Sequence, residues 1–195
     1  MFSIDKSNTK TSFRELADLV EPDNLKVLRL TNVEIAGDED DEFYFARAVR
    51  GHPGIEQVIL TNITLDKGMN MDSVIEMMLV SCHELHTLKL NAVPVRAKSC
   101  ATLAYCETLE TLALTNNGFN DIDAKLIAES VETNKSVTSV DLSGNRISDV
   151  GCKSLRLCLE KNTTITEIKL AGNSISGSET LMLETKLQGR TAVAA

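Results

Sequence analysis

The sequence predicts an α/β solenoid in which short parallel strands alternate with helices, and three observations support this fold. First, residues 137–147 (VTSVDLSGNRI) and 165–175 (ITEIKLAGNSI) share one pattern, L-x-x-L-x-L-x-x-N-x-L, with Leu, Ile or Val at the apolar positions. Second, shorter versions of the same pattern occur four times before residue 137. Third, a segment with helical spacing follows every copy. Each copy therefore reads as one strand–helix unit.

The strands come first in each unit. Their first apolar residues give steps of 30, 30, 24, 28 and 28 residues and are Leu25, Ile55, Leu85, Leu109, Val137 and Ile165. Each opens a block in which apolar residues alternate with polar ones, as a half-buried strand requires. The helices are predicted between the strands, at residues 40–50, 72–81, 97–106, 121–133, 149–161 and 178–187.

The pattern and the period of about 28 residues are those of the leucine-rich repeat. We therefore predict a solenoid of about six repeats, with a curved parallel sheet on its concave face and helices on its convex face. A repeat of this length favours full helices over short 3₁₀ turns.

The two ends of the chain are less regular than its centre. Residues 1–11 are polar and are predicted to be a flexible N-terminus. A capping helix is predicted at 12–20, where Ser12 and Glu15 have the spacing of a capping box. The repeat domain then spans residues 12–187 with this helix included, and residues 188–195 are predicted to be a flexible tail.

Composition narrows the classes of function. The formal net charge is −8, which disfavours direct binding to nucleic acid or to anionic membranes. No apolar run has the length of a signal peptide or of a membrane span. The five cysteines are odd in number and are expected to be reduced and buried. These features predict a cytoplasmic protein.

An asparagine position divides the repeats into two halves. It is occupied by the predicted structural asparagines of repeats four to six, Asn117, Asn145 and Asn173, and by the aliphatic residues of repeats one to three, Val33, Ile63 and Val93. An asparagine side chain can pair backbone groups of the turn that leaves the strand. The backbone groups of the first three turns need other partners, and the side chains of the neighbouring Asn32, Asn62 and Asn91 are candidates.

The repeat form resembles the ribonuclease-inhibitor-like class of leucine-rich repeat proteins over roughly residues 12–187. Within that class, the segment KNTTITEIKLAGNSISGSETLMLETKL resembles the repeats of tropomodulin and leiomodin, which are actin pointed-end proteins. The resemblance implies a cytoskeletal role. Ran GTPase-activating proteins have the same class of repeat and use an arginine and an asparagine on the strand-to-helix turns, where Arg96 and Arg146 stand here.

The predicted partner-binding surface is the concave face of the sheet. It is rich in hydroxyl groups, with isolated charges and two exposed aliphatic side chains, Val27 and Ile59. Its residues are Val27, Arg29, Thr31, Gln57, Ile59, Thr61, Thr87, Lys89, Asn91, Asp141, Glu167 and Lys169. The alternative is a solvated sheet face, with binding elsewhere, for example at the ends of the solenoid.

Other clusters of reactive side chains point less clearly to a site. The acidic run 37–42 (GDEDDE) could dock a basic partner or a cation, but it also suits the start of a helix. Cys82, His83 and His86 have no fourth ligand at suitable spacing, so no metal is predicted. No nucleophile motif or phosphate-binding glycine loop occurs, so neither a cofactor nor catalysis is expected.

The predicted function is protein–protein interaction without catalysis. We expect a scaffold-like small subunit or adaptor in a larger cytosolic or cytoskeletal assembly. The alternatives are an actin regulator of the tropomodulin type and, less favoured, a regulator of a GTPase.

Overall fold

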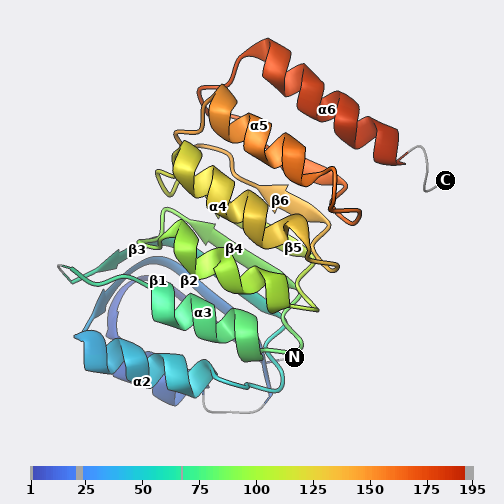
Figure 1. Cartoon of the computed structure of the whole chain (residues 1–195). Coiled ribbons are helices and arrows are strands. Elements are labelled where there is room, and N and C mark those ends of the chain that lie inside the picture. The colour runs from blue at the N-terminus through green and yellow to red at the C-terminus, as the bar shows by residue number, and fades with distance from the viewer. Residues whose placement is uncertain (1, 21–23, 67, 192–195) are drawn as a thin grey trace.

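The computed structural model describes residues 2–20, 24–66 and 68–191. These residues form one parallel sheet with helices on one side (Figure 1). The strand order follows the sequence from β1 to β7, and every pair of neighbours is parallel. The strands are β1 (Phe2–Ser12), β2 (Leu25–Ala36), β3 (Gln57–Leu65), β4 (Thr87–Asn91), β5 (Thr111–Thr115), β6 (Ser139–Asp141) and β7 (Glu167–Lys169).

The helices form a second layer that covers one face of the sheet (Figure 1). They are α1 (Phe13–Val20), α2 (Glu39–Val49), α3 (Asp72–Ser81), η1 (Ala97–Tyr105), α4 (Asp121–Glu132), α5 (Asp149–Cys158) and α6 (Gly177–Thr191). A strand followed by a helix, seven times over, is the predicted α/β leucine-rich repeat solenoid.

The core lies between the sheet and the helices. It is aliphatic because alternate strand residues point to the helices and are almost all Leu, Ile or Val. One register row of the sheet shows this, with Leu28, Val58, Leu88, Leu112 and Val140 side by side and each at most 1% exposed. Phe13 of α1 and Phe45 of α2 add an aromatic contact to this core, with ring centroids 6.0 Å apart.

The N-terminus differs from the predicted flexible segment. Phe2–Ser12 form β1, which pairs with β2 along its whole length, from Phe2 opposite Leu25 to Ser12 opposite Ala36. The helix after it, α1, begins with the expected capping box between Ser12 and Glu15. The sequence hid this strand because, apart from Ile4, the positions paired with Leu30, Val33 and Ile35 carry Lys6 and two threonines instead of aliphatic residues. The described residues therefore form seven strand–helix units.

The first three strands are longer than the others because they continue past a left-handed residue. Asn8, Asn32 and Asn62 have φ values of 52°, 53° and 51°, a conformation that asparagine tolerates better than most residues. Their side chains form a row: Asn62 Nδ2 donates to Asn32 Oδ1 (2.8 Å), and Asn32 Nδ2 donates to Asn8 Oδ1 (2.9 Å). Strand pairing resumes beyond them, so the backbone at Val33 and Ile63 is paired without a consensus asparagine.

Two helices differ from the predicted ones. The segment Ala97–Tyr105 is a 3₁₀-helix, because the 24-residue repeat leaves too few residues for a full α-helix. At the other end, α6 continues to Thr191, so residues 188–191 are helical and not part of a flexible tail. Residues 192–195 of that predicted tail lie outside the described residues.

The five cysteines are free and buried, and their thiols are expected to be unreactive in the folded protein. Burial raises the pKa of Cys100 and Cys158 to about 12 and that of Cys82 and Cys152 to about 11. At pH 8 these four thiols are therefore protonated and shielded. We expect a maleimide to label the native protein slowly and the protein in urea rapidly. Rapid labelling of a native thiol at pH 8 would contradict this structure.

Candidate protein-binding surfaces

The sheet face opposite the helices, called the concave face below, brings the predicted binding residues together in straight rows. The central row is Asp5, Arg29, Ile59, Lys89, Ala113, Asp141 and Lys169, each directly beside the next in the strand register. A row on one side holds Ser3, Val27, Gln57, Thr87, Thr111, Ser139 and Glu167, and a row on the other holds Ser7, Thr31, Thr61, Asn91 and Thr115.

Exposure along these rows corrects one expectation. Arg29 and Lys89 are exposed and Ile59 is half-buried between them, as a binding surface requires. Val27, which was expected to be exposed, is buried with 6% of its surface accessible. In the strand register it lies between Ser3 of β1 and Gln57 of β3. The aliphatic contribution to this surface therefore comes from Ile59.

The two halves of the concave face differ in how their charges are paired. Toward the C-terminus, Glu167 lies 3.1 Å from Lys169 Nζ and accepts a hydrogen bond from Ser139 Oγ (2.7 Å), which lowers the pKa of its carboxyl group. Asp141 accepts from the backbone N–H of Ser143 (2.9 Å). The charges of this half are thus occupied by neighbours within the chain.

The N-terminal half leaves its cations more available. Arg29 lies 3.9 Å from Asp5 Oδ2 in an exposed pair, which contributes little. For Lys89, the described part of the chain supplies no ion-pair partner. Two cations flanking a half-buried isoleucine, bordered by hydroxyl groups, can bind a carboxylate together with an apolar side chain.

The consensus asparagines pair backbone groups inside the turns. Asn145 is 6% exposed; its Nδ2 donates to the carbonyl oxygens of Leu114 and Leu142 at 2.8 Å each. Its Oδ1 accepts from the N–H groups of Asn117 (3.0 Å) and Phe119 (3.1 Å). Asn117 and Asn173 make equivalent contacts in their own turns.

A second ladder of asparagines, which the sequence analysis missed, lies where the helices end. Asn134 and Asn162 are 2% and 0% exposed. Asn162 Nδ2 donates to the carbonyl oxygens of Val131 (2.8 Å) and Asn134 (3.0 Å). Asn134 and Asn162 stand 28 residues apart, so they occupy the same position in consecutive repeats. This spacing could have revealed the ladder from the sequence alone.

Arg190 continues this ladder in place of a third asparagine. It stands 28 residues after Asn162, and its guanidinium group donates to the carbonyl oxygens of Leu159, Asn162 and Ile165. Asparagine both donates and accepts, whereas arginine only donates. Arg190 therefore serves the last described repeat and offers no acceptor to another one.

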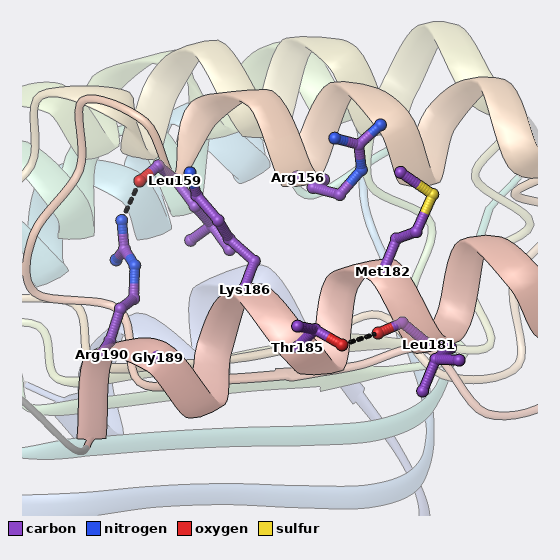
Figure 2. Close-up of a pocket in the computed structure, with 8 residues that line it drawn as sticks. All are labelled: Arg156, Leu159, Leu181, Met182, Thr185, Lys186, Gly189 and Arg190. Carbon is purple, nitrogen blue, oxygen red and sulfur yellow. Dashed lines mark hydrogen bonds between the residues drawn. The ribbon is translucent and has the colours of Figure 1, made fainter.

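Arg190 also closes one end of a groove of about 700 Å³ between α5 and α6 (Figure 2). Arg156 on α5 lies 3.6 Å from Glu179, and Thr185 donates to the Leu181 carbonyl oxygen (2.7 Å). The groove is lined by Arg156, Leu159, Leu181, Met182, Thr185, Lys186, Gly189 and Arg190. Two of its three cations are thus held by neighbours, and Lys186 is exposed.

The acidic run at residues 37–42 starts α2. Asp38 caps the helix by accepting from the Asp41 N–H (3.0 Å), and Asp41 pairs with Arg14. Glu42 is 7% exposed and accepts from the Ser73 N–H (3.2 Å), while burial raises the pKa of its carboxyl group. These internal contacts account for three of the acids.

The remaining candidates are not gathered into a site. Cys82 is buried and its Sγ donates to the Val49 carbonyl oxygen (3.3 Å). Within the described ranges, no group of three or more His, Cys, Asp and Glu side chains is arranged to hold a metal ion. Arg96 and Arg146 are exposed on their turns, and Arg96 Nε lies 3.7 Å from buried Asp72. None of the helices in the described segments combines the length and apolar character needed to cross a bilayer.

Comparison with protein families agrees with the fold. A family model described as "Leucine Rich repeat" matches residues 105–128 and 133–155. Comparison with curated proteins gives no match. Among the solved structures that match is "Leiomodin-1 Actin-Binding Site 2 (ABS2)", with 25% identity and a TM-score of 0.43. The match covers 48% of this chain and 55% of that one, so the chain spans about half of it.

The leucine-rich repeat is in general a protein-interaction fold, and its stacked units create extended binding surfaces. The coarse function of this chain is accordingly that of a protein-interaction module. The seven-stranded parallel sheet with its covering helices has the architecture of a leucine-rich repeat solenoid, and two segments of the chain match the leucine-rich repeat family model.

Proposed function

We propose that this protein is a subunit or adaptor of a larger assembly, and that it binds a protein partner through the N-terminal half of the concave face. The partner segment is acidic and carries an apolar side chain. The observation that supports this proposal is the row Arg29, Ile59, Lys89, in which two exposed cations flank a half-buried aliphatic side chain on adjacent strands.

Charge makes this row distinctive. The chain is acidic overall, so two cations in one short row are a local exception. Of the two, Arg29 makes an exposed ion pair with Asp5. Complementary charge contributes mainly to partner choice and to the rate of association. Ile59 supplies the apolar contact, and Thr61, Thr87 and Asn91 supply polar groups at the border.

Charge reversal tests the proposal. Wild-type protein and the double variant Arg29→Glu with Lys89→Glu would each be used to capture partners from a cell extract. We expect the amount of captured partner, measured by mass spectrometry, to fall at least tenfold in the double variant. The matched control is Lys135→Glu with Lys153→Glu, which changes the net charge equally at exposed positions outside the concave rows. Equal capture by both double variants would refute the concave-face proposal.

Actin is the alternative partner, because the last complete repeat resembles those of tropomodulin and leiomodin in sequence. Cosedimentation with filaments and the rate of growth at the pointed end would test it. An effect on growth that the control variant retains and the Arg29 and Lys89 variant loses would identify actin as the partner. Without any effect on filaments or monomers, the actin alternative is rejected.

A further inference from the structure

The two ends of the solenoid are built differently. At the N-terminal end, the positions of β1 that face the helices hold Ile4, which is buried, and the polar residues Lys6, Thr9 and Thr11, so this end is more polar than the inner strands. At the C-terminal end, the equivalent layer is apolar and incompletely covered. Ile168, Leu170, Ile175 and Leu187 are only partly buried, whereas their counterparts 28 residues earlier, Val140, Leu142, Ile147 and Leu159, are at most 1% exposed.

A hollow of about 470 Å³ lies at this C-terminal end. Its apolar wall is formed by Ile168, Leu170, Ile175 and Leu183, and Thr180 and Glu184 of α6 border it. Repeat proteins require a polar outer face on their terminal units to remain soluble as monomers. Among the described units, the first carries mostly polar residues at these positions, whereas the last leaves apolar residues partly exposed.

The last strand also has a free edge. Within the described segments, β7 pairs with β6 and with no other strand. The Glu167 N–H donates to the Thr138 carbonyl oxygen (3.1 Å), and the Lys169 carbonyl oxygen accepts from Leu142 N–H (2.8 Å). Because backbone groups alternate sides along a strand, the N–H and C=O of Ile168 point to the free edge. Such an edge is a template for pairing with another strand.

The charges on β7 are self-complementary. In an antiparallel pair of two β7 strands centred on Ile168, Glu167 lies opposite Lys169 of the other strand, twice over, and the two Ile168 residues face each other. Opposite charges in directly opposed positions stabilise a pair of strands. Within one copy Glu167 and Lys169 pair with each other at 3.1 Å, but both side chains are about half exposed, at 48% and 54%, so this contact can be exchanged for one with the second copy.

We propose that the C-terminal end is a homodimer interface in which β7 of one copy pairs antiparallel with β7 of a second copy. The sheet then continues from one copy into the other, and the apolar hollows cover each other. This is an isologous contact, which closes after two copies.

A head-to-tail stack fits the structure less well. Continuing the parallel sheet into β1 of a second copy would place Lys6 beside Leu170, because Lys6 belongs to the same register row as Leu30, Leu60, Leu90 and Leu114. That arrangement buries an ammonium group against the apolar layer, which is costly without a partner. It would also produce open polymers instead of dimers.

The test uses the charge pattern of β7 and leaves the apolar residues unchanged. We expect sedimentation equilibrium of the whole chain to show dimers at about 100 µM, the range of weak protein association. Lys169→Glu alone and Glu167→Lys alone should each weaken dimerisation at least tenfold, since like charges then face each other. An equimolar mixture of these two variants should dimerise again, and so should the double variant with both charges exchanged.

Each outcome of the sedimentation experiment either supports or overturns the proposed dimer. Loss of dimers in each single variant, followed by recovery in the mixture and in the exchanged double variant, supports the proposed antiparallel register, in which each charge faces the opposite charge of the other copy. A wild-type monomer at about 100 µM overturns the interface. Dimers that ignore all the charge changes, or polymers larger than dimers, overturn it as well. Circular dichroism of each variant checks that the fold is retained.

Discussion

Replacing Asn162 with alanine is expected to lower the free energy of unfolding by roughly 3 kcal/mol, because several buried backbone groups lose their partner at once. Its amide donates to the carbonyl oxygens of Val131 and Asn134, and its Oδ1 accepts from the N–H groups of Thr164 and Ile165 at 2.9 Å each. The side chain is fully buried. Urea unfolding followed by circular dichroism measures the change.

Asn24→Ala is the control for that variant. Asn24 is an exposed asparagine in a turn, and its replacement should change stability by about 0.5 kcal/mol or less. If Asn162→Ala cost no more than this control, the ladder at the helix ends would not carry the stability assigned to it.

Gly151→Ala is expected to destabilise the protein by about 2 kcal/mol, although alanine normally favours a helix over glycine by roughly 1 kcal/mol. A Cβ atom at Gly151 would lie 2.6 Å from Ile147 Cγ2, 2.7 Å from Asp121 Oδ1 and 3.0 Å from Ala124 Cβ. Asp121 cannot move freely because it accepts from the N–H groups of Ser148 (2.7 Å) and Gly151 (3.0 Å). Thermal or urea unfolding would measure the loss.

A second glycine reverses the sign of the expected effect. Gly189 also lies within a helix, but a Cβ atom there would meet nothing within 4 Å. Gly189→Ala should therefore stabilise the protein by about 0.5 kcal/mol or more. Stabilisation by both substitutions would mean that α4 and α5 do not approach each other at Gly151 as closely as the structure places them.

The sequence predicted the fold wherever apolar residues alternate. Leu25, Ile55, Leu85 and their successors mark six of the seven units, because their side chains are the core. β1 escaped prediction because its stability depends on pairing with β2 and not on an apolar pattern of its own. Helix type was likewise missed at 97–106, where the spacing between strands, and not local propensity, decides how much helix fits.

The sequence predicted which residues lie on the candidate binding surface, but not how buried each of them is. The parallel register places Arg29, Ile59 and Lys89 in one row, as the repeat alignment implied. Val27 is buried, and it lies beside β1, a strand that the sequence did not predict. The groove between α5 and α6 could not be foreseen either, since it depends on how α6 packs against α5.

The backbone N–H and C=O groups after each strand are paired in two different ways in this chain, and Val33 and Ile63 show the first of them. In the first repeats the strands continue past the left-handed asparagines, so neighbouring strands pair the backbone. In the last repeats the strands end earlier, and Asn117, Asn145 and Asn173 pair it instead. The change occurs at Val93, whose N–H is the first to be accepted by a consensus asparagine, Asn117 (2.9 Å).

The native size of the endogenous protein tests the proposed function most directly. Gentle extraction, separation by size and mass spectrometry of the copurifying proteins would show whether the chain travels in a complex. The proposal predicts a reproducible particle that contains other proteins and is larger than a dimer of this 21.3 kDa chain. Migration only as a monomer or a homodimer, with no other protein, would contradict the role of a subunit or adaptor.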